Sequence, residues 1–166
     1  YECDSKVGVV HSIEDFQNNT SQVEQMTIDL AQKNIDFDLI FAGNKALPVK
    51  IDSSKLKQYK YVVLPINSAL SEIDQKSMQQ YAQIGKVIKD INEIGNEVKI
   101  DLPGESLVRA TIRKHSTDKN KPYVLHLLNR DYDMATDSCR AKKNFKINIP
   151  DSLEKKKKIT KVILHQ

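Results

Sequence analysis

Short apolar runs alternate with segments of helical spacing through the first half of the chain. The clearest run is Tyr61–Pro65, in which β-branched and aromatic residues follow one another without a polar interruption. It is too short for a helix and lacks the alternation of a half-exposed strand, so it predicts a strand buried on both faces. Similar runs occur at Val7–Val10, Phe37–Phe41 and Lys86–Ile88. Strands of this kind are typical of a parallel sheet covered by helices.

A first helix is predicted between the runs at Val7 and Phe37. Val23, Met26, Leu30 and Ala31 recur at helical spacing and would form one apolar face. The preceding Ser21-Gln22-Val23-Glu24 matches a capping box, with Ser21 as the N-cap. Asn34 stands where the helix would end.

A second helix is predicted from Ser71 to Ala82, with Ser71 as its cap and acidic residues in its first turn. Gly85 is expected to end it in a left-handed conformation. Between the strands at Phe37 and Tyr61, a loop or a short helical turn around Leu56 is expected. Gly8, inside the first strand, would let a helix approach closely.

The pattern changes to strict alternation after about Glu97. Val108–Arg113 and Tyr123–Leu128 read as a β-hairpin, and Phe145–Ile149 and Ile159–Leu164 as two further strands. Four short strands without a helix suggest a β-sandwich or part of one. The predicted fold class is therefore α/β: a small flavodoxin-like three-layer domain with a parallel sheet over residues 1–95, followed by an all-β sandwich-like domain over residues 96–166.

Composition narrows the classes of function. The chain has 166 residues, of which 39% are hydrophobic and 29% charged, with a net charge of +4. A charge this modest gives no reason to expect nucleic-acid binding, and no apolar run approaches the length of a membrane span. The chain opens at Tyr1 without a methionine and ends in the apolar run Val162–Leu164, so a fragment of a larger protein is expected.

An open α/β sheet binds ligands beyond the carboxyl ends of its strands, which places the candidate ligand-binding residues in three loops. These residues are His11, Asn44, Asn67 and Ser68. No glycine-rich phosphate loop follows the first strand, so no cofactor is expected. Ser68 could act as a nucleophile only with His11 within reach. The favoured interpretation is that Asn67 and Ser68 make turn hydrogen bonds before the second helix.

Other polar clusters have ordinary explanations that we favour. No histidine pair has metal-ligand spacing, so no metal site is predicted. The acidic stretch Asn129–Asp137 could hold calcium but is better explained as a solvated loop, because Arg130 lies within it and an EF-hand glycine is missing. The lysine run Glu154–Lys158 reads as a soluble loop. Cys3 and Cys139 could form a disulfide or be two unrelated thiols.

The order of segments resembles a known arrangement. In the first half, Lys6–Val10, Ile35–Ile40, Tyr59–Pro65 and Tyr81–Ile88 resemble the glutamine-amidotransferase-like domain that follows the catalytic barrel in many bacterial glycoside hydrolases and is related to the β-galactosidase trimerisation domain. This chain carries Ile84-Gly85 where that family usually has two glycines. In the second half, Leu107–Thr111 and Tyr123–Asp133 resemble the small β-sandwich that ends such enzymes.

The resemblance implies a noncatalytic accessory C-terminal region of a carbohydrate-active enzyme. It would pack against the catalytic barrel of the same polypeptide or support homo-oligomer formation, and it would be secreted, periplasmic or on the cell surface. The family's catalytic residues lie in the barrel, so none is carried over. Two alternatives stay open: a stand-alone module that binds a small sugar at the strand-end loops, and a degenerate hydrolase that uses Ser68 and His11.

Overall fold

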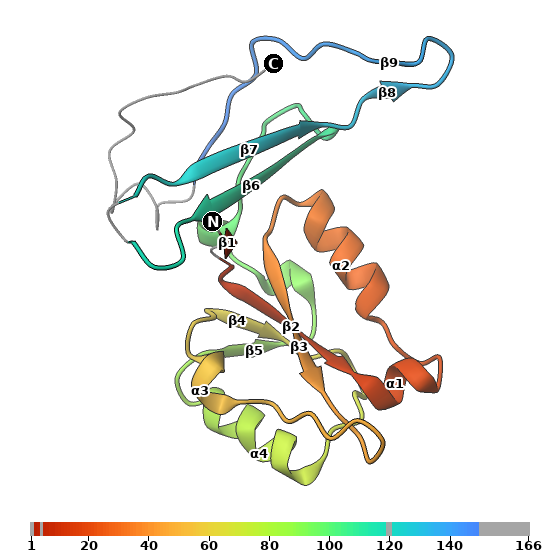
Figure 1. Ribbon diagram of the computed structural model, residues 1–166, viewed down its shortest axis with the longest axis vertical. Coiled ribbons are helices and arrows are strands. Elements are labelled where there is room, and N and C mark those ends of the chain that lie inside the picture. Colours follow the sequence, from red (N-terminus) through yellow and green to blue (C-terminus); the bar gives the residue numbers. More distant parts are fainter. Residues whose placement is uncertain (1, 4, 119–120, 150–166) are drawn as a thin grey trace.

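The structure is a computed structural model that describes residues 2–3, 5–118 and 121–149 (Figure 1). Five of its strands and four α-helices belong to the first ninety residues, and two 3-10 helices lead into the remaining strands. In chain order the elements are β1 (Glu2–Cys3), β2 (Val7–Ser12), α1 (Ile13–Gln17), α2 (Val23–Gln32), β3 (Phe37–Ala42), α3 (Ser53–Leu56), β4 (Tyr61–Val63), α4 (Glu72–Tyr81), β5 (Lys86–Ile88), η1 (Ile91–Glu93), η2 (Asn96–Val98), β6 (Val108–Lys114), β7 (Val124–Asn129), β8 (Tyr132–Asp133) and β9 (Ser138–Cys139).

The first half forms a four-stranded sheet in the order β3-β2-β4-β5. All three pairings are parallel, with Val7 opposite both Phe37 and Tyr61. Numbered along the sheet's own strands, this is the order 2-1-3-4 that begins a flavodoxin-like sheet. The predicted α/β domain followed by a β region is therefore confirmed.

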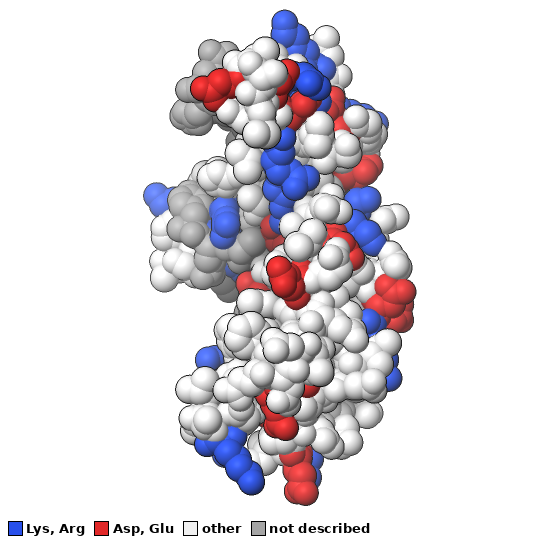
Figure 2. Space-filling view, turned by 90° about the vertical axis from the view of Figure 1, so that its right-hand side faces the viewer, with Lys and Arg blue, Asp and Glu red and all other residues white. Residues whose placement is uncertain are grey.

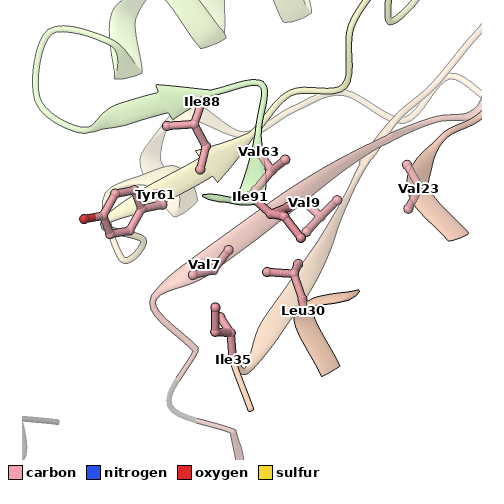
Figure 3. Packing of buried hydrophobic residues seen from close by; sticks show 9 residues of the cluster. All are labelled: Val7, Val9, Val23, Leu30, Ile35, Tyr61, Val63, Ile88 and Ile91. Atoms are coloured by element: carbon pink, nitrogen blue, oxygen red, sulfur yellow. The ribbon is translucent and has the colours of Figure 1, made fainter. Parts of the chain in front are cut away.

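Two apolar clusters fill the space on either side of this sheet, because alternate residues of each strand point to opposite faces. On one face, Val7 and Val9 pack with Leu30 of α2 (Figure 3). On the other, Val10 and Val62 pack with residues of α3 and α4. Figure 1 shows α2 on one side of the sheet and α3 and α4 on the other, which gives the three layers.

The helix ends confirm part of the predicted capping. Ser71 is the N-cap of α4, and its hydroxyl accepts the N–H of Asp74. Asn34 lies just beyond α2 with a positive φ of 54°, as a helix stop requires. The capping box at Ser21 is wrong: the N-cap is Gln22, and the Ser21 hydroxyl accepts the N–H of Val23 instead of that of Glu24.

Two glycines lack a side chain for steric reasons that differ from those predicted. Gly85 is not in a left-handed conformation; a Cβ there would lie 2.1 Å from the ring of Tyr81, which is why the position has no side chain. Gly8 does not accommodate a helix. A Cβ on Gly8 would meet the side chain of Ile40 at 2.4 Å and the ring of Tyr59 at 3.1 Å. In both places the close neighbour is a side chain that lies across the backbone.

The second half contains the predicted hairpin, in which β6 and β7 are antiparallel from Val108 opposite Asn129 to Arg113 opposite Val124. The first residues of the chain were not expected here, yet β1 pairs with the far end of β6 and gives a sheet in the order β1-β6-β7. A two-residue ladder between β8 and β9 was also not predicted.

The strand predicted at Phe145–Ile149 is wrong. Only one isolated bridge forms there, between Asn148 and Asp101. The alternating apolar side chains of this segment nevertheless pack against the core of the β region. The sequence pattern therefore predicted the burial of one face correctly, but the hydrogen-bonded strand pairing wrongly. The strand predicted at Ile159–Leu164 lies outside the described residues, as does the lysine run Glu154–Lys158.

Two polar side chains after α2 join the parallel sheet to β6. Asn34 Oδ1 accepts the backbone N–H of Ala110 at 3.0 Å, and Asp36 Oδ2 accepts the N–H of Ile112 at 3.1 Å. The other oxygen of Asp36 binds the guanidinium of Arg109 at 3.0 Å. Since alternate N–H groups of a strand point to opposite edges, Asn34 and Asp36 replace a neighbouring strand along this part of β6.

Candidate functional site

The loops at the carboxyl ends of β2, β3 and β4 meet around α1, a short helix that was not predicted from the sequence. Ser12 is its N-cap and accepts the N–H of Asp15. The same hydroxyl donates to the carbonyl of Ala69 at 2.8 Å, while the carboxylate of Asp15 accepts the N–H of Ala69 at 3.1 Å. These bonds attach the loop after β4 to the end of β2.

Asn67 and Ser68 form the turn that the favoured interpretation predicted. Asn67 has a φ of 61°, in the left-handed region that asparagine tolerates. The hydroxyl of Ser68 donates to the carbonyl of Pro65 at 2.9 Å, and the Ser68 N–H approaches the same oxygen. A nucleophilic serine would instead donate its proton to a base such as His11. The geometry of Ser68 therefore gives no support to the hydrolase alternative.

His11 lies between two aromatic rings at the end of β2. Its ring centroid is 5.6 Å from that of Phe16 on α1 and 5.6 Å from that of Phe41 on β3. Its Nδ1 is buried and has no hydrogen-bond partner among the described residues. The surroundings of His11 are thus aromatic and not those of a general base held by a carboxylate.

Asn44 lies close to the same end of the sheet through α1. Its carboxamide oxygen accepts the N–H groups of Ala46 and Leu47, and its nitrogen donates to Gln17 Oε1 at 2.7 Å. Gln17 is the last residue of α1, one position after Phe16. The helix therefore brings Asn44 and His11 to one surface, with Asn67 and Ser68 attached at its other end. As ligand-binding residues, these four remain a prediction.

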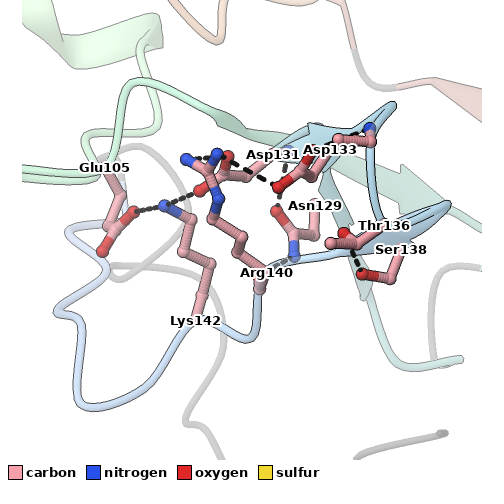
Figure 4. Close-up of polar contacts among 9 residues, drawn as sticks. Glu105, Asn129, Asp131, Asp133, Thr136, Ser138, Arg140 and Lys142 are labelled. Carbon is pink, nitrogen blue, oxygen red and sulfur yellow. Dashed lines mark hydrogen bonds and ion pairs between the residues drawn. The ribbon is translucent and has the colours of Figure 1, made fainter.

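The acidic stretch after β7 is neutralised by the protein's own cations (Figure 4). Asp131 binds Lys142 at 2.8 Å and Arg140 at 3.6 Å, and Arg140 also reaches Asp133 at 3.5 Å. The hydrogen bond from Lys142 lowers the pKa of Asp131, and the same bond raises the pKa of Lys142. Carboxylates occupied in this way are poor calcium ligands, and no group of three metal-binding side chains occurs in the described part of the chain.

A second cluster of interacting polar groups lies at the opposite end of the parallel sheet. Glu97 accepts from the hydroxyl of Tyr61 at 2.6 Å and pairs with Lys60 at 2.8 Å. The hydrogen bonds from Lys60 and then Tyr61 lower the pKa of Glu97 to about 2, and the bond to Glu97 raises the pKa of Tyr61. This cluster ties η2 to the start of β4, so we assign it to stability.

Sequence reasoning missed Phe16, Phe41 and the helix that carries Phe16. A signal was present: Ser12 followed three residues later by Asp15, with Glu14 between them, is a helix start with acids in the first turn. Phe41 was recognised only as part of a strand. Its exposure follows from its position on β3, which is an edge strand of the sheet.

Cys139 is a free and exposed thiol in β9. Of the two alternatives left open by the sequence, the structure therefore shows the unpaired state for this cysteine. In the described residues, no helix has the length and apolar character needed to cross a membrane.

Comparison with known proteins relates the chain to glycoside hydrolases. It is 27% identical over 140 residues to an alpha-agarase of Thalassotalea agarivorans and 25% identical over 143 residues to an alpha-agarase of Alteromonas agarilytica. Each match covers 77% of this chain but only 9% and 10% of the relative, so the chain spans about a tenth of the length of these proteins. No protein-family model matches the chain, and no solved structure does.

The chain is thus similar to a small region of two alpha-agarases, which are glycoside hydrolases, in agreement with the resemblance at that coarse level. The type of domain, amidotransferase-like or other, is a proposal.

Proposed function

We propose that the chain is a noncatalytic accessory region of a secreted carbohydrate-active enzyme, with an amidotransferase-like α/β domain over residues 1–95 and a β-sandwich-like domain over residues 96–166. The observation that carries this proposal is the similarity to a small part of two much longer alpha-agarases. The relatives' name suggests that the whole enzyme acts on an agarose-type galactan. The hydroxyl of Ser68, committed to its own turn, supports a noncatalytic role.

The proposed role of this region is to pack against the catalytic barrel of the same polypeptide. The end of β7 and the β8–β9 hairpin carry exposed apolar side chains that could make that contact. Leu128, Tyr132 and Met134 are exposed there, and Met134 at the turn is 87% exposed. Figure 1 shows this hairpin projecting away from the parallel sheet. Exposed apolar groups gathered on a projection are typical of a contact surface.

The isolated chain tests the first part of the proposal. It should release no reducing sugar from agarose or from any other glycoside, and hydrolysis by it would refute the noncatalytic assignment.

The longer enzyme tests the contact with the barrel. Met134→Ser should lower the unfolding temperature of the longer enzyme and leave that of the isolated chain unchanged, because the side chain is exposed in the latter. Ile84→Ser is the matched control, since Ile84 is 64% exposed and follows α4 at the other end of the molecule. Equal effects of the two substitutions would contradict packing through the hairpin. A shift of the isolated chain from monomer to oligomer as its concentration is raised would indicate the alternative role in oligomer formation.

A further inference from the structure

Three aromatic rings form a continuous surface at the carboxyl ends of β2 and β3. His11 contacts Phe16 on one side and Phe41 on the other, with the ring planes at 58° and 85°. Phe16 is 62% exposed and Phe41 is 46% exposed. We call these three residues the aromatic patch.

Two of the protein's four phenylalanines lie in this exposed patch, where their rings contribute little burial energy to folding. Burying one such ring contributes about 1.5–3 kcal/mol, yet two of them face solvent here. The parallel register places His11 opposite Phe41 and Val9 opposite Leu39, so Leu39 lies on the same face of the sheet. Leu39 is exposed as well and extends the patch along β3. Contiguous exposed apolar side chains can mark a ligand-binding surface.

Two uncharged amide groups lie beside the patch, while the acidic Glu14 and Asp15 precede Phe16 on α1. Gln17 follows Phe16 directly, and its carboxamide is bonded to that of Asn44 at 2.7 Å. Figure 2 shows a largely uncharged area on the lower half of this side of the molecule, interrupted by a group of acidic side chains. Aromatic faces combined with a few amide groups can recognise a ligand that has both apolar C–H surfaces and hydroxyls.

We infer that the aromatic patch binds an uncharged galactan chain of the agarose type, an inference that rests on the function proposed above. The apolar faces of the sugar rings stack on Phe16 and Phe41, and the carboxamides of Gln17 and Asn44 bond to sugar hydroxyls. The choice of a neutral galactan follows from the name of the two relatives. The position also agrees with the general rule for open α/β sheets, whose ligands lie beyond the carboxyl ends of the strands.

The test is depletion of the isolated chain from solution by washed agarose beads. High salt is used, because it screens the attraction of a basic chain to residual acidic groups on the beads. The wild-type chain should bind, and soluble agarose oligosaccharides should release it. Phe16→Ala and Phe41→Ala should each weaken binding by about five- to tenfold, the loss of one aromatic stacking contact. Phe16→Tyr should retain binding, and Ile84→Ala, the matched exposed apolar control, should leave it unchanged.

Absence of wild-type binding would overturn the inference, as would equal binding by the wild-type chain and both alanine variants. Thermal unfolding shows whether each variant is folded. Phe16→Ala is the decisive variant, because the ring of Phe16 is exposed on a short helix and its removal should leave the fold intact. If Phe16→Ala leaves bead binding intact but lowers the unfolding temperature of the longer enzyme, the patch is a contact for the barrel and the inference is wrong. None of these results affects the noncatalytic assignment, which the hydrolysis assay tests separately.

Discussion

Asn34 Oδ1 lies 3.0 Å from the backbone nitrogen of Ala110, which is 76 positions further along the chain, and accepts its hydrogen bond. The asparagine is buried and has the positive φ that ends α2. One residue thus serves two purposes: its backbone turns the chain out of the helix, and its side chain occupies the open edge of β6. The joint between the parallel and antiparallel sheets depends on this pair.

Substitution of Asn34 separates the two purposes. Asn34→Gly keeps the left-handed backbone but leaves the N–H of Ala110 unpaired, at a cost of about 1–3 kcal/mol in the free energy of unfolding. Asn34→Ala should cost about 1 kcal/mol more, because alanine is strained at positive φ. Asn34→Asp keeps an acceptor oxygen and should be the mildest. Urea unfolding of the three variants measures the differences, and equal effects of glycine and alanine would contradict a role for the backbone.

Gly85→Ala should destabilise the protein by about 1–3 kcal/mol, the usual range for overpacking a core. The new Cβ would overlap the ring of Tyr81, which is buried and bonded through its hydroxyl to the carbonyl of Tyr59. Gly104→Ala is an informative control, because Gly104 has a φ of 80° but no atom within 4 Å of a Cβ. It should lose only the cost of the strained backbone, about 1 kcal/mol.

For Gly85, loss of the near-ultraviolet circular dichroism of the tyrosines would show directly that the ring of Tyr81 has moved. An unchanged signal together with full stability would refute the steric explanation.

Asp74 is 1% exposed, and both of its oxygens are used. Oδ1 accepts the N–H of Ile51 at 2.7 Å and Oδ2 accepts the hydroxyl of Ser71 at 2.7 Å. Asp74→Ala should cost about 2–3 kcal/mol, because it leaves the buried N–H of Ile51 without a partner. Asp74→Asn should cost less, since its amide oxygen can still accept that N–H. Thermal or urea unfolding tests the order, and the reverse order would show that the charge matters more than the acceptor.

The pairing of Glu97 makes stability depend on pH in the acid range. Its pKa is lowered from 4.5 to about 2 in the folded protein, so the unfolded chain binds the proton more readily. The contribution is therefore fully present above pH 4.5 and is lost as the pH falls toward about 2. Glu97→Gln should flatten the acid limb of a plot of urea midpoint against pH. High salt should flatten it as well, because the pair is partly exposed. An unaltered limb in the variant would assign the acid sensitivity to other carboxylates.

The parallel sheet could be predicted because its strands are short and mostly apolar, as in Tyr61–Val63, whose burial on both faces is typical of a parallel sheet. The β region was harder. Phe145–Ile149 alternates like a strand, yet only its side chains join the core, and alternation cannot distinguish one-sided packing from a hydrogen-bonded ladder. The two residues of β1 carry no periodicity at all; their pairing with β6 is a tertiary contact that a local pattern does not encode.

The strand-end loops could be predicted from the sequence, but the residues that surround them could not. His11 lies at the end of β2 and Asn44 follows β3, so both could be found from the rule on strand ends. The aromatic character of the surface could not, because it arises when α1 folds back and brings Phe16 against the ring of His11. The register that sets His11 beside Phe41 is equally invisible in the sequence.

The pairing of Glu2–Cys3 with β6 means that the chain begins in one sheet, crosses into the other, and returns after a hundred residues. A cut between residues 95 and 96 would therefore separate hydrogen-bonded partners. The first piece would contain β1 without β6, with which it pairs. The second piece would contain β6 without the side chains of Asn34 and Asp36, which accept its backbone N–H groups. We expect the two halves to melt together and to be inherited, exchanged or fused as one block.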